Sequence, residues 1–200
     1  MKRLLIIETI PDRHGASEGI ALKQALEIMK KSWDGRTTRQ LKIDVEQAFT
    51  KKSFLSKIEE ETDFLHISAH GKKEKTGDRH ILLVGKTGKE VTPDDVKKRN
   101  PKAACIFVSA CCAGYNDLAS SFFCNGRKGF YLAPVSKPPF DEAFLVALQF
   151  HRGAFLEEFA GKGVNVGKER VGKRTRNLVA ELKSVKRKYG YFEFPRDLQK

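Results

Sequence analysis

An apolar stretch that ends in a cluster of small residues constrains the fold of this chain more than any other feature. Residues 104–108 form a continuous apolar run, which predicts a strand buried on both faces. Ser, Ala, two Cys, Ala and Gly follow as far as Gly114, and all are small enough for a tight turn. A second apolar run, residues 64–68, stops in the same way before His70. Because neighbouring parallel strands end at one edge of a sheet, we expect His70 and Cys111 to lie close together there.

A cysteine beside a histidine at this edge is the pair that a thiol nucleophile and its proton acceptor require. Cys111 is the candidate nucleophile, and a buried free cysteine is the alternative reading of the same residue. Cys112 is a competing candidate that we interpret as a neighbour of the nucleophile. His66 precedes the end of its strand and is expected in the core. The remaining histidines are expected at the surface: His14, His80 and His151.

The length and cysteine content favour one reduced, cytoplasmic domain. A chain of 200 residues with 40% apolar content is sufficient for one core. No run of eighteen apolar residues predicts a membrane span, and the short aliphatic run at the start reads as a first strand rather than a signal peptide. The four cysteines are irregularly spaced and lack a paired C-x-x-C spacing, so we expect free thiols and neither a metal nor another cofactor.

Strands and helices alternate along the chain. This order predicts a three-layer, flavodoxin-like α/β fold with a mostly parallel sheet and helices on both faces. Strands are predicted at residues 4–10, 41–45, 64–68, 104–109 and 129–135, with a hairpin-like excursion over the site that includes 81–84, and an edge strand at 189–194. Helices are predicted at residues 17–31, 51–61, 116–124, 141–160 and 168–188, and as a short helix capped by Thr92.

The positive charge is concentrated near the end of the chain. Residues 162–200 contain 12 Lys or Arg and 4 Asp or Glu, a balance of +8 out of a total of +13. We therefore divide the chain into residues 1–161, the main domain, and residues 162–200, a basic C-terminal helix packed on or extending it. Such a helix attracts nucleic acid, anionic lipid or an acidic partner, although a solvated helix face is the simpler interpretation.

Two motifs resemble those of a known peptidase family. Residues 63–71, Asp-Phe-Leu-His-Ile-Ser-Ala-His-Gly, resemble the His-Gly motif of caspase-like cysteine peptidases, most closely that of the CHAT family. Residues 107–114 contain Ser-Ala-Cys-x-x-Gly, which resembles the nucleophile motif of that family. The resemblance covers about residues 60–160. It implies a caspase-like fold and a cysteine endopeptidase that cleaves a protein or peptide in bacterial defence or regulated cell death, with a sensor or activator protein as a further partner.

The resemblance also implies a role for each site residue. Cys111 would attack the scissile carbonyl, and His70 would act as general base and then protonate the leaving amine. The backbone N–H groups of Gly71 and Cys111 would form the oxyanion hole.

Three acidic residues are candidates for the wall of the substrate pocket. They occupy loops or helix starts expected at the same edge of the sheet: Asp12, Asp117 and Asp141. A carboxylate in the pocket selects Arg or Lys at the cleavage position. Helix capping is an alternative role for these residues, most of all for Asp141.

Two other functions remain open on the sequence. One is a catalytically silent caspase-like scaffold that binds a partner. The other is a module that binds nucleic acid or an acidic partner through the basic C-terminal helix.

Overall fold

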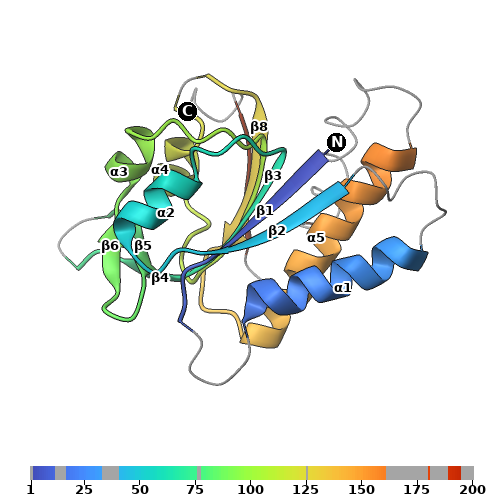
Figure 1. Ribbon diagram of the computed structural model, residues 1–200. Helices are drawn as coiled ribbons and strands as arrows, with labels where there is room; N and C mark the ends of the chain where they lie inside the picture. Colours follow the sequence, from blue (N-terminus) through green and yellow to red (C-terminus); the bar gives the residue numbers. More distant parts are fainter. Residues whose placement is uncertain are drawn as a thin grey trace.

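A six-stranded sheet forms the centre of the described part of the molecule (Figure 1). The structure is a computed structural model that describes residues 2–11, 17–32, 41–75, 78–124, 126–160, 180 and 189–194. The strand order is β2-β1-β3-β7-β8-β9, and β9 alone runs antiparallel to its neighbour. The strands are β1 (Lys2–Glu8), β2 (Leu41–Gln47), β3 (Phe64–Ser68), β7 (Cys105–Ser109), β8 (Gly129–Pro134) and β9 (Tyr189–Phe194). The predicted mostly parallel α/β sheet is therefore confirmed.

The interior strands are mostly apolar because both of their faces are covered. Side chains of β3 and β7 alternate between two core clusters, so that Ile67 packs on one side and Phe64 on the other. The same alternation separates Val108 from Phe107 on β7. A strand covered on one face only would show polar residues at every second position.

Helices cover both faces of the sheet, as the sequence predicts. Figure 1 shows α1 (Glu18–Ser32) and α5 (Phe140–Ala160) together on one face, where they contribute Leu22, Leu26, Val146 and Phe150 to the core. The opposite face is covered by α2 (Lys51–Lys57), α3 (Pro93–Lys97) and α4 (Asn116–Ser121). The predicted caps are confirmed, since Ser17 Oγ accepts the N–H of Ile20 and Thr92 forms a capping box with Asp95.

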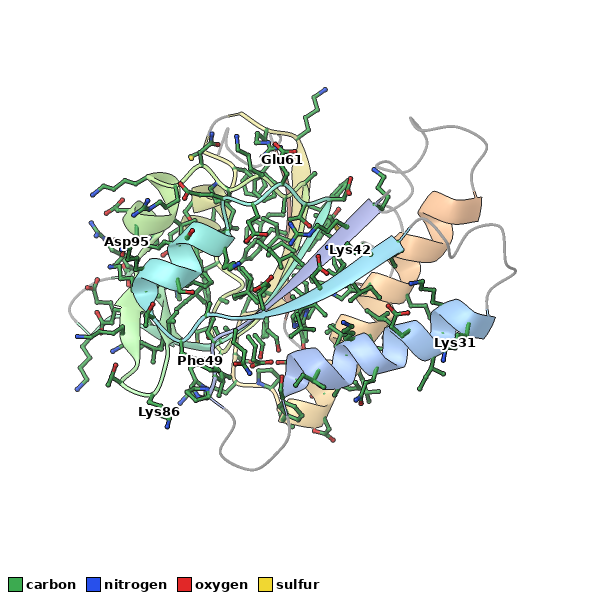
Figure 2. The ribbon with its side chains drawn as sticks, viewed as in Figure 1. Lys31, Lys42, Phe49, Glu61, Lys86 and Asp95 are labelled. Atoms are coloured by element: carbon green, nitrogen blue, oxygen red, sulfur yellow. The ribbon has the colours of Figure 1, made fainter. Side chains whose placement is uncertain are left out.

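A second, antiparallel sheet lies beside the carboxyl ends of the main strands. It comprises β4 (His70–Lys73), β5 (His80–Val84) and β6 (Lys89–Val91), in that order. The backbone N–H of Gly85, in the turn after β5, donates to the carbonyl of Thr9 at the end of β1 over 3.0 Å. Figure 2 shows Phe49 and Lys86 in the lower part of the view, near this sheet, and Glu61 far from it at the top. The predicted hairpin is confirmed, and β4 is a strand that the polar sequence after His70 does not predict.

The C-terminal part of the chain returns to the main sheet. Residues 189–194 form β9, the predicted edge strand, paired with β8. The predicted basic helix at 168–188 falls outside the described residues apart from Ala180, which is helical. The boundary between residues 1–161 and 162–200 therefore stays a prediction. Among the described helices, none combines the length and apolar character needed to cross a membrane.

Candidate active site

Strands β3 and β7 bring His70 and Cys111 to one edge of the sheet. The two strands pair in parallel, with Ser68 opposite Ser109. Each candidate catalytic residue lies two positions beyond its paired serine. One further backbone bond, from the N–H of Ala69 to the carbonyl of Ser109 over 3.1 Å, extends the pairing toward them. The expected juxtaposition of the two strand ends is present in the structure.

The backbone of Gly71 lies directly against the backbone of Cys111. A Cβ atom placed on Gly71 would overlap the carbonyl oxygen of Cys111 and lie 3.3 Å from the Cβ of Ala110. Only glycine permits so close an approach. The His-Gly segment therefore crosses the nucleophile turn in van der Waals contact, with the His70 side chain exposed and Cys111 half-buried.

Residues 110–113 form a tight turn that is held by a hydrogen bond to the loop after β8. The N–H of Ala113 donates to the carbonyl of Ala110 over 3.3 Å, and Cys112 within the turn has a φ of 55°. This left-handed conformation is uncommon for a residue other than glycine and is concentrated at functional sites. The N–H of Cys112 donates to the carbonyl of Ser136 over 3.1 Å, so the loop after β8 holds the turn in place.

The thiol of Cys111 is protonated at neutral pH in this structure. Burial raises the pKa of Cys111 above its ordinary value, and the neighbouring Cys112 raises it further. The ammonium of Lys137 and the backbone N–H of Cys111 itself act in the opposite direction without offsetting the burial. The raised pKa keeps this thiol mainly in its protonated, less nucleophilic form at neutral pH.

Alkylation of Cys111 by iodoacetamide is expected to be slow at neutral pH and to rise as the pH increases. The thiolate is the form that displaces iodide, and the raised pKa of Cys111 keeps its population small. Peptide mapping by mass spectrometry between pH 6 and 10 measures the rate at this residue alone. Half-maximal alkylation should occur at a higher pH than for the same cysteine in the urea-unfolded chain, and a lower midpoint in the folded protein would contradict the prediction.

The candidate pocket carboxylates have different surroundings. Asp117, in the first turn of α4, accepts the backbone N–H of His80 over 2.7 Å and lies 3.0 Å from the Nδ1 of the same residue. The His80 ring stacks on Tyr115 with centroids 3.7 Å apart. Asp141 is exposed in the first turn of α5, and Asp12 lies outside the described residues. Their contribution to a substrate pocket stays a prediction.

The histidines differ from expectation at two positions. His66 is fully buried, as predicted. His80 and His151 were expected at the surface, and this is wrong, because both are buried. His80 begins β5 and is covered by Tyr115, while His151 lies on the apolar stripe of α5, three residues after Leu148. That helical spacing is the sequence feature from which the burial of His151 could have been recognised. His14 lies outside the described residues.

A buried polar network lies behind the site, on the face of the sheet covered by α1 and α5. The Nδ1 of His66 is 3.1 Å from the Nε2 of His151. The other ring nitrogen of His66, Nε2, is 3.6 Å from the carboxylate of Glu18. Ser68 Oγ donates to the same carboxylate over 2.7 Å. Sequence reasoning placed Ser17 as the cap of α1 and missed Glu18, the next residue.

Burial and neighbouring groups together set the charges of Glu18 and His151 in this network. Burial alone would raise the pKa of Glu18, but hydrogen bonding and charge attraction from His66, together with the hydrogen bond from Ser68, lower it below the ordinary value. The pKa of His151 is well below 6.5, first because of burial and then because of the neighbouring His66. Glu18 is therefore ionised and His151 neutral at pH 7.

Acidification below pH 6.5 is expected to destabilise the protein through His151. Its folded pKa is lowered, so as the pH falls below 6.5 the unfolded chain binds a proton that the folded chain does not. The folding equilibrium should weaken by up to about tenfold per pH unit from this residue. Urea unfolding at pH 7.0 and 5.5 measures the loss. A His151→Gln variant should lose less stability over the same interval, and an equal loss in both proteins would contradict the prediction.

Comparisons with known proteins found no match by sequence and only a distant likeness in structure. No family model and no curated protein matches the sequence. Within the described ranges, no three His, Cys, Asp or Glu side chains are grouped as metal ligands would be. Among solved structures, the chain is similar to the Drosophila initiator caspase Dronc, with a TM-score of 0.40 and 11% sequence identity. The match covers 75% of this chain and 63% of the caspase chain, so it spans less than two thirds of that protein. A likeness this distant does not assign the chain to a family.

Proposed function

We propose that this chain is a cysteine endopeptidase in which His70 and Cys111 form the catalytic dyad. The observation that carries the proposal is the close packing of Gly71 against Cys111 at the ends of two paired strands. This packing fixes the segment that bears the histidine over the turn that bears the thiol. Nucleophile and base on adjacent strand ends are the arrangement that covalent catalysis by a thiol requires.

The proposed reaction proceeds through an acyl-enzyme. The sulfur of Cys111 attacks the carbonyl carbon of the scissile peptide bond while its proton passes to His70. Backbone N–H groups of Gly71 and Cys111 donate to the oxyanion of the tetrahedral intermediate. His70 then gives its proton to the leaving nitrogen, and the C–N bond breaks to leave a thioester. Water, deprotonated by His70, hydrolyses the thioester to a carboxylate and regenerates the thiol.

The raised pKa of Cys111 bears on how this reaction begins. A protonated resting thiol requires that proton transfer to His70 accompany the attack on the substrate. The resting protein is then weakly reactive toward other electrophiles. This property suits a peptidase that is activated by a sensor or activator protein, in bacterial defence or regulated cell death, as the resemblance to CHAT peptidases implies.

The proposed preference is for a basic side chain at the cleavage position. Asp117 is the described carboxylate nearest in sequence to Cys111, and His80 holds it in a fixed orientation. Asp141 is exposed and available to a substrate. A carboxylate in either position favours Arg or Lys through charge-assisted hydrogen bonds.

Mapping cleavage sites in a peptide library derived from a proteome tests the proposed activity. Wild-type protein and the Cys111→Ala variant are incubated with the library, and new peptide termini are identified by mass spectrometry. Cuts made only by the wild type support the endopeptidase, and Arg or Lys before the cut supports the acidic pocket. The absence of cuts by a folded wild-type protein, alone and with a cell extract as a source of activator, would contradict the proposal.

A partner-binding scaffold of the same fold is the second candidate. The raised pKa of Cys111 is consistent with it as well, because a scaffold needs no ionised thiol. In a scaffold, Cys111→Ala would leave partner binding and biological effect intact. An endopeptidase with the same substitution would lose its effect while still binding its substrate.

A further inference from the structure

Two neighbouring segments carry a dense positive charge at the edge of the sheet opposite the proposed dyad. One segment, residues 97–102, runs from the end of α3 toward β7, and the other, residues 126–128, leads into β8. Of these nine residues, six are cationic and none is acidic. The six cations together form the basic surface: Lys97, Lys98, Arg99, Lys102, Arg127 and Lys128.

Hydrogen bonds join the two segments side by side. The thiol of Cys124, just before the second segment, donates to the carbonyl of Lys97 over 3.6 Å. Arg127 Nη1 donates to the carbonyl of Pro101 over 2.9 Å. Beyond these contacts the segments enter β7 and β8, which pair directly in the sheet. The cations therefore project from adjacent stretches of backbone.

The charge of the basic surface is not compensated by nearby carboxylates. Among the described residues, Glu59 is the one carboxylate that approaches it, at 4.0 Å from Arg99, and both side chains are exposed. Such a surface pair contributes little. The cations at the start of β1 are arranged differently, because Arg3 lies 2.8 Å from both Asp44 and Glu60. Positive charge thus persists at the starts of β7 and β8.

The structure of the protein alone does not account for this gathering of cations. Like charges close together repel one another, and this repulsion costs stability unless an anion lies against them. The dipole of α3 favours Lys97, which lies in the last turn of that helix. Lys102 and Lys128 lie in no helix. The basic surface therefore suits an external polyanion.

The composition of the basic surface favours double-stranded DNA among polyanions. Single strands are held by aromatic side chains on which bases stack, and membranes by apolar side chains that insert among the lipids. The other residues of the two segments are Asn100, Pro101 and Gly126, which supply neither. The large hydrophobic side chains that are exposed in the described ranges all lie elsewhere. Lys and Arg neutralise the phosphates of a duplex whatever its base sequence.

We propose that the basic surface binds the phosphate backbone of double-stranded DNA. It precedes β7 and β8, whereas Cys111 follows the opposite end of β7. A bound duplex therefore leaves the candidate active site open. The inference goes beyond the proposed peptidase activity and does not depend on it.

The test measures the affinity of the full chain for a fluorescently labelled DNA duplex by anisotropy, between about 50 and 200 mM salt. The test variant replaces four lysines of the basic surface together: Lys97→Gln, Lys98→Gln, Lys102→Gln and Lys128→Gln. We expect the slope of log affinity against log salt to become shallower by about three to four, and the affinity at about 100 mM salt to fall at least a hundredfold.

A control variant removes the same charge from the small antiparallel sheet and its turn, near the candidate active site. It carries Lys72→Gln, Lys73→Gln, Lys86→Gln and Lys89→Gln. Its salt slope should change by less than about one. Cys111→Ala should bind the duplex as the wild type does, so DNA binding and peptidase activity succeed or fail separately.

Each outcome decides the inference. The absence of duplex binding by the wild type, an unchanged affinity in the test variant, or an equal loss in both fourfold variants would overturn it. Tighter binding to phosphatidylserine vesicles than to the duplex would overturn it in favour of a membrane surface. Circular dichroism and the melting temperature establish that each variant is folded. Should the test variant not fold, Lys98→Gln and Lys128→Gln replace it singly, each with an expected loss of about one in slope, and an unchanged slope in both would count against the basic surface.

Discussion

Cys111→Ala, His70→Ala and the double variant are expected to show nearly the same residual peptidase activity, at least about a thousandfold below the wild type. The two residues act as one unit, since the thiol of Cys111 is protonated and attacks only as its proton is taken by the base. Once either member is absent, removing the other has little left to change. The measurement is kcat/KM for one peptide identified in the library, determined for all four proteins.

Cys112→Ala is the matched control for this series. Cys112 is adjacent to the proposed nucleophile and is also a half-buried free thiol. Its φ of 55° is set by the turn and is equally available to alanine as to cysteine, so the turn should be preserved. This variant should keep activity within a few-fold of the wild type. Loss of activity in Cys112→Ala together with retention in Cys111→Ala would make Cys112 the nucleophile.

Gly71→Ala is expected to lower kcat/KM by roughly a hundredfold or more. The added methyl group would overlap the carbonyl oxygen of Cys111, and backbone atoms cannot move aside as a flexible side chain can. The His-Gly segment and the nucleophile turn must therefore separate. The separation displaces His70 from the thiol and also moves one proposed oxyanion donor. Steady-state kinetics on the same peptide measure the effect.

Lys72→Ala controls for general damage to strand β4. Lys72 follows Gly71 and pairs with Glu90 on the molecular surface, so its loss should cost little stability and little activity. If Gly71→Ala is folded by circular dichroism and as active as Lys72→Ala, the packing of Gly71 against Cys111 has no catalytic consequence. The proposed dyad would then have to be placed elsewhere.

The main strands and helices of this protein are predictable because their determinants are local. The apolar runs at residues 64–68 and 104–108 are long enough to fill a strand and too short for a helix, and both are strands in the structure. Capping residues define the starts of α1 and α3 in the same way. The helix predicted at 51–61 ends earlier, at Lys57, with Ile58 at its C-cap position.

The meeting of His70 and Cys111 follows from the sequence together with one general rule about parallel sheets. His70 comes two positions after Ser68 and Cys111 two positions after Ser109, so parallel pairing of these two serines places His70 and Cys111 level with each other. This placement also requires that β3 and β7 be direct neighbours in the sheet. The order of the strands along the sequence does not determine which strands are neighbours, and in the structure β3 and β7 are.

Other features depend on contacts between residues that are distant in the sequence. Strand β4 has a polar sequence, and it is a strand because β5 supplies hydrogen-bond partners. His80 and His151 are buried because Tyr115 and His66 lie against them.

The residues of the candidate site are predictable from local sequence, whereas their chemical state depends on contacts between distant residues. The order and spacing of small residues, histidine and cysteine determined by themselves which residues stand at the strand ends. Only the tertiary structure decided that Gly71 touches Cys111, that burial raises the pKa of that thiol, and that Ser68 donates a hydrogen bond to the buried carboxylate of Glu18. The physical reason is that strand formation depends on nearest neighbours and periodicity, whereas desolvation and hydrogen bonding depend on which segments pack around a group.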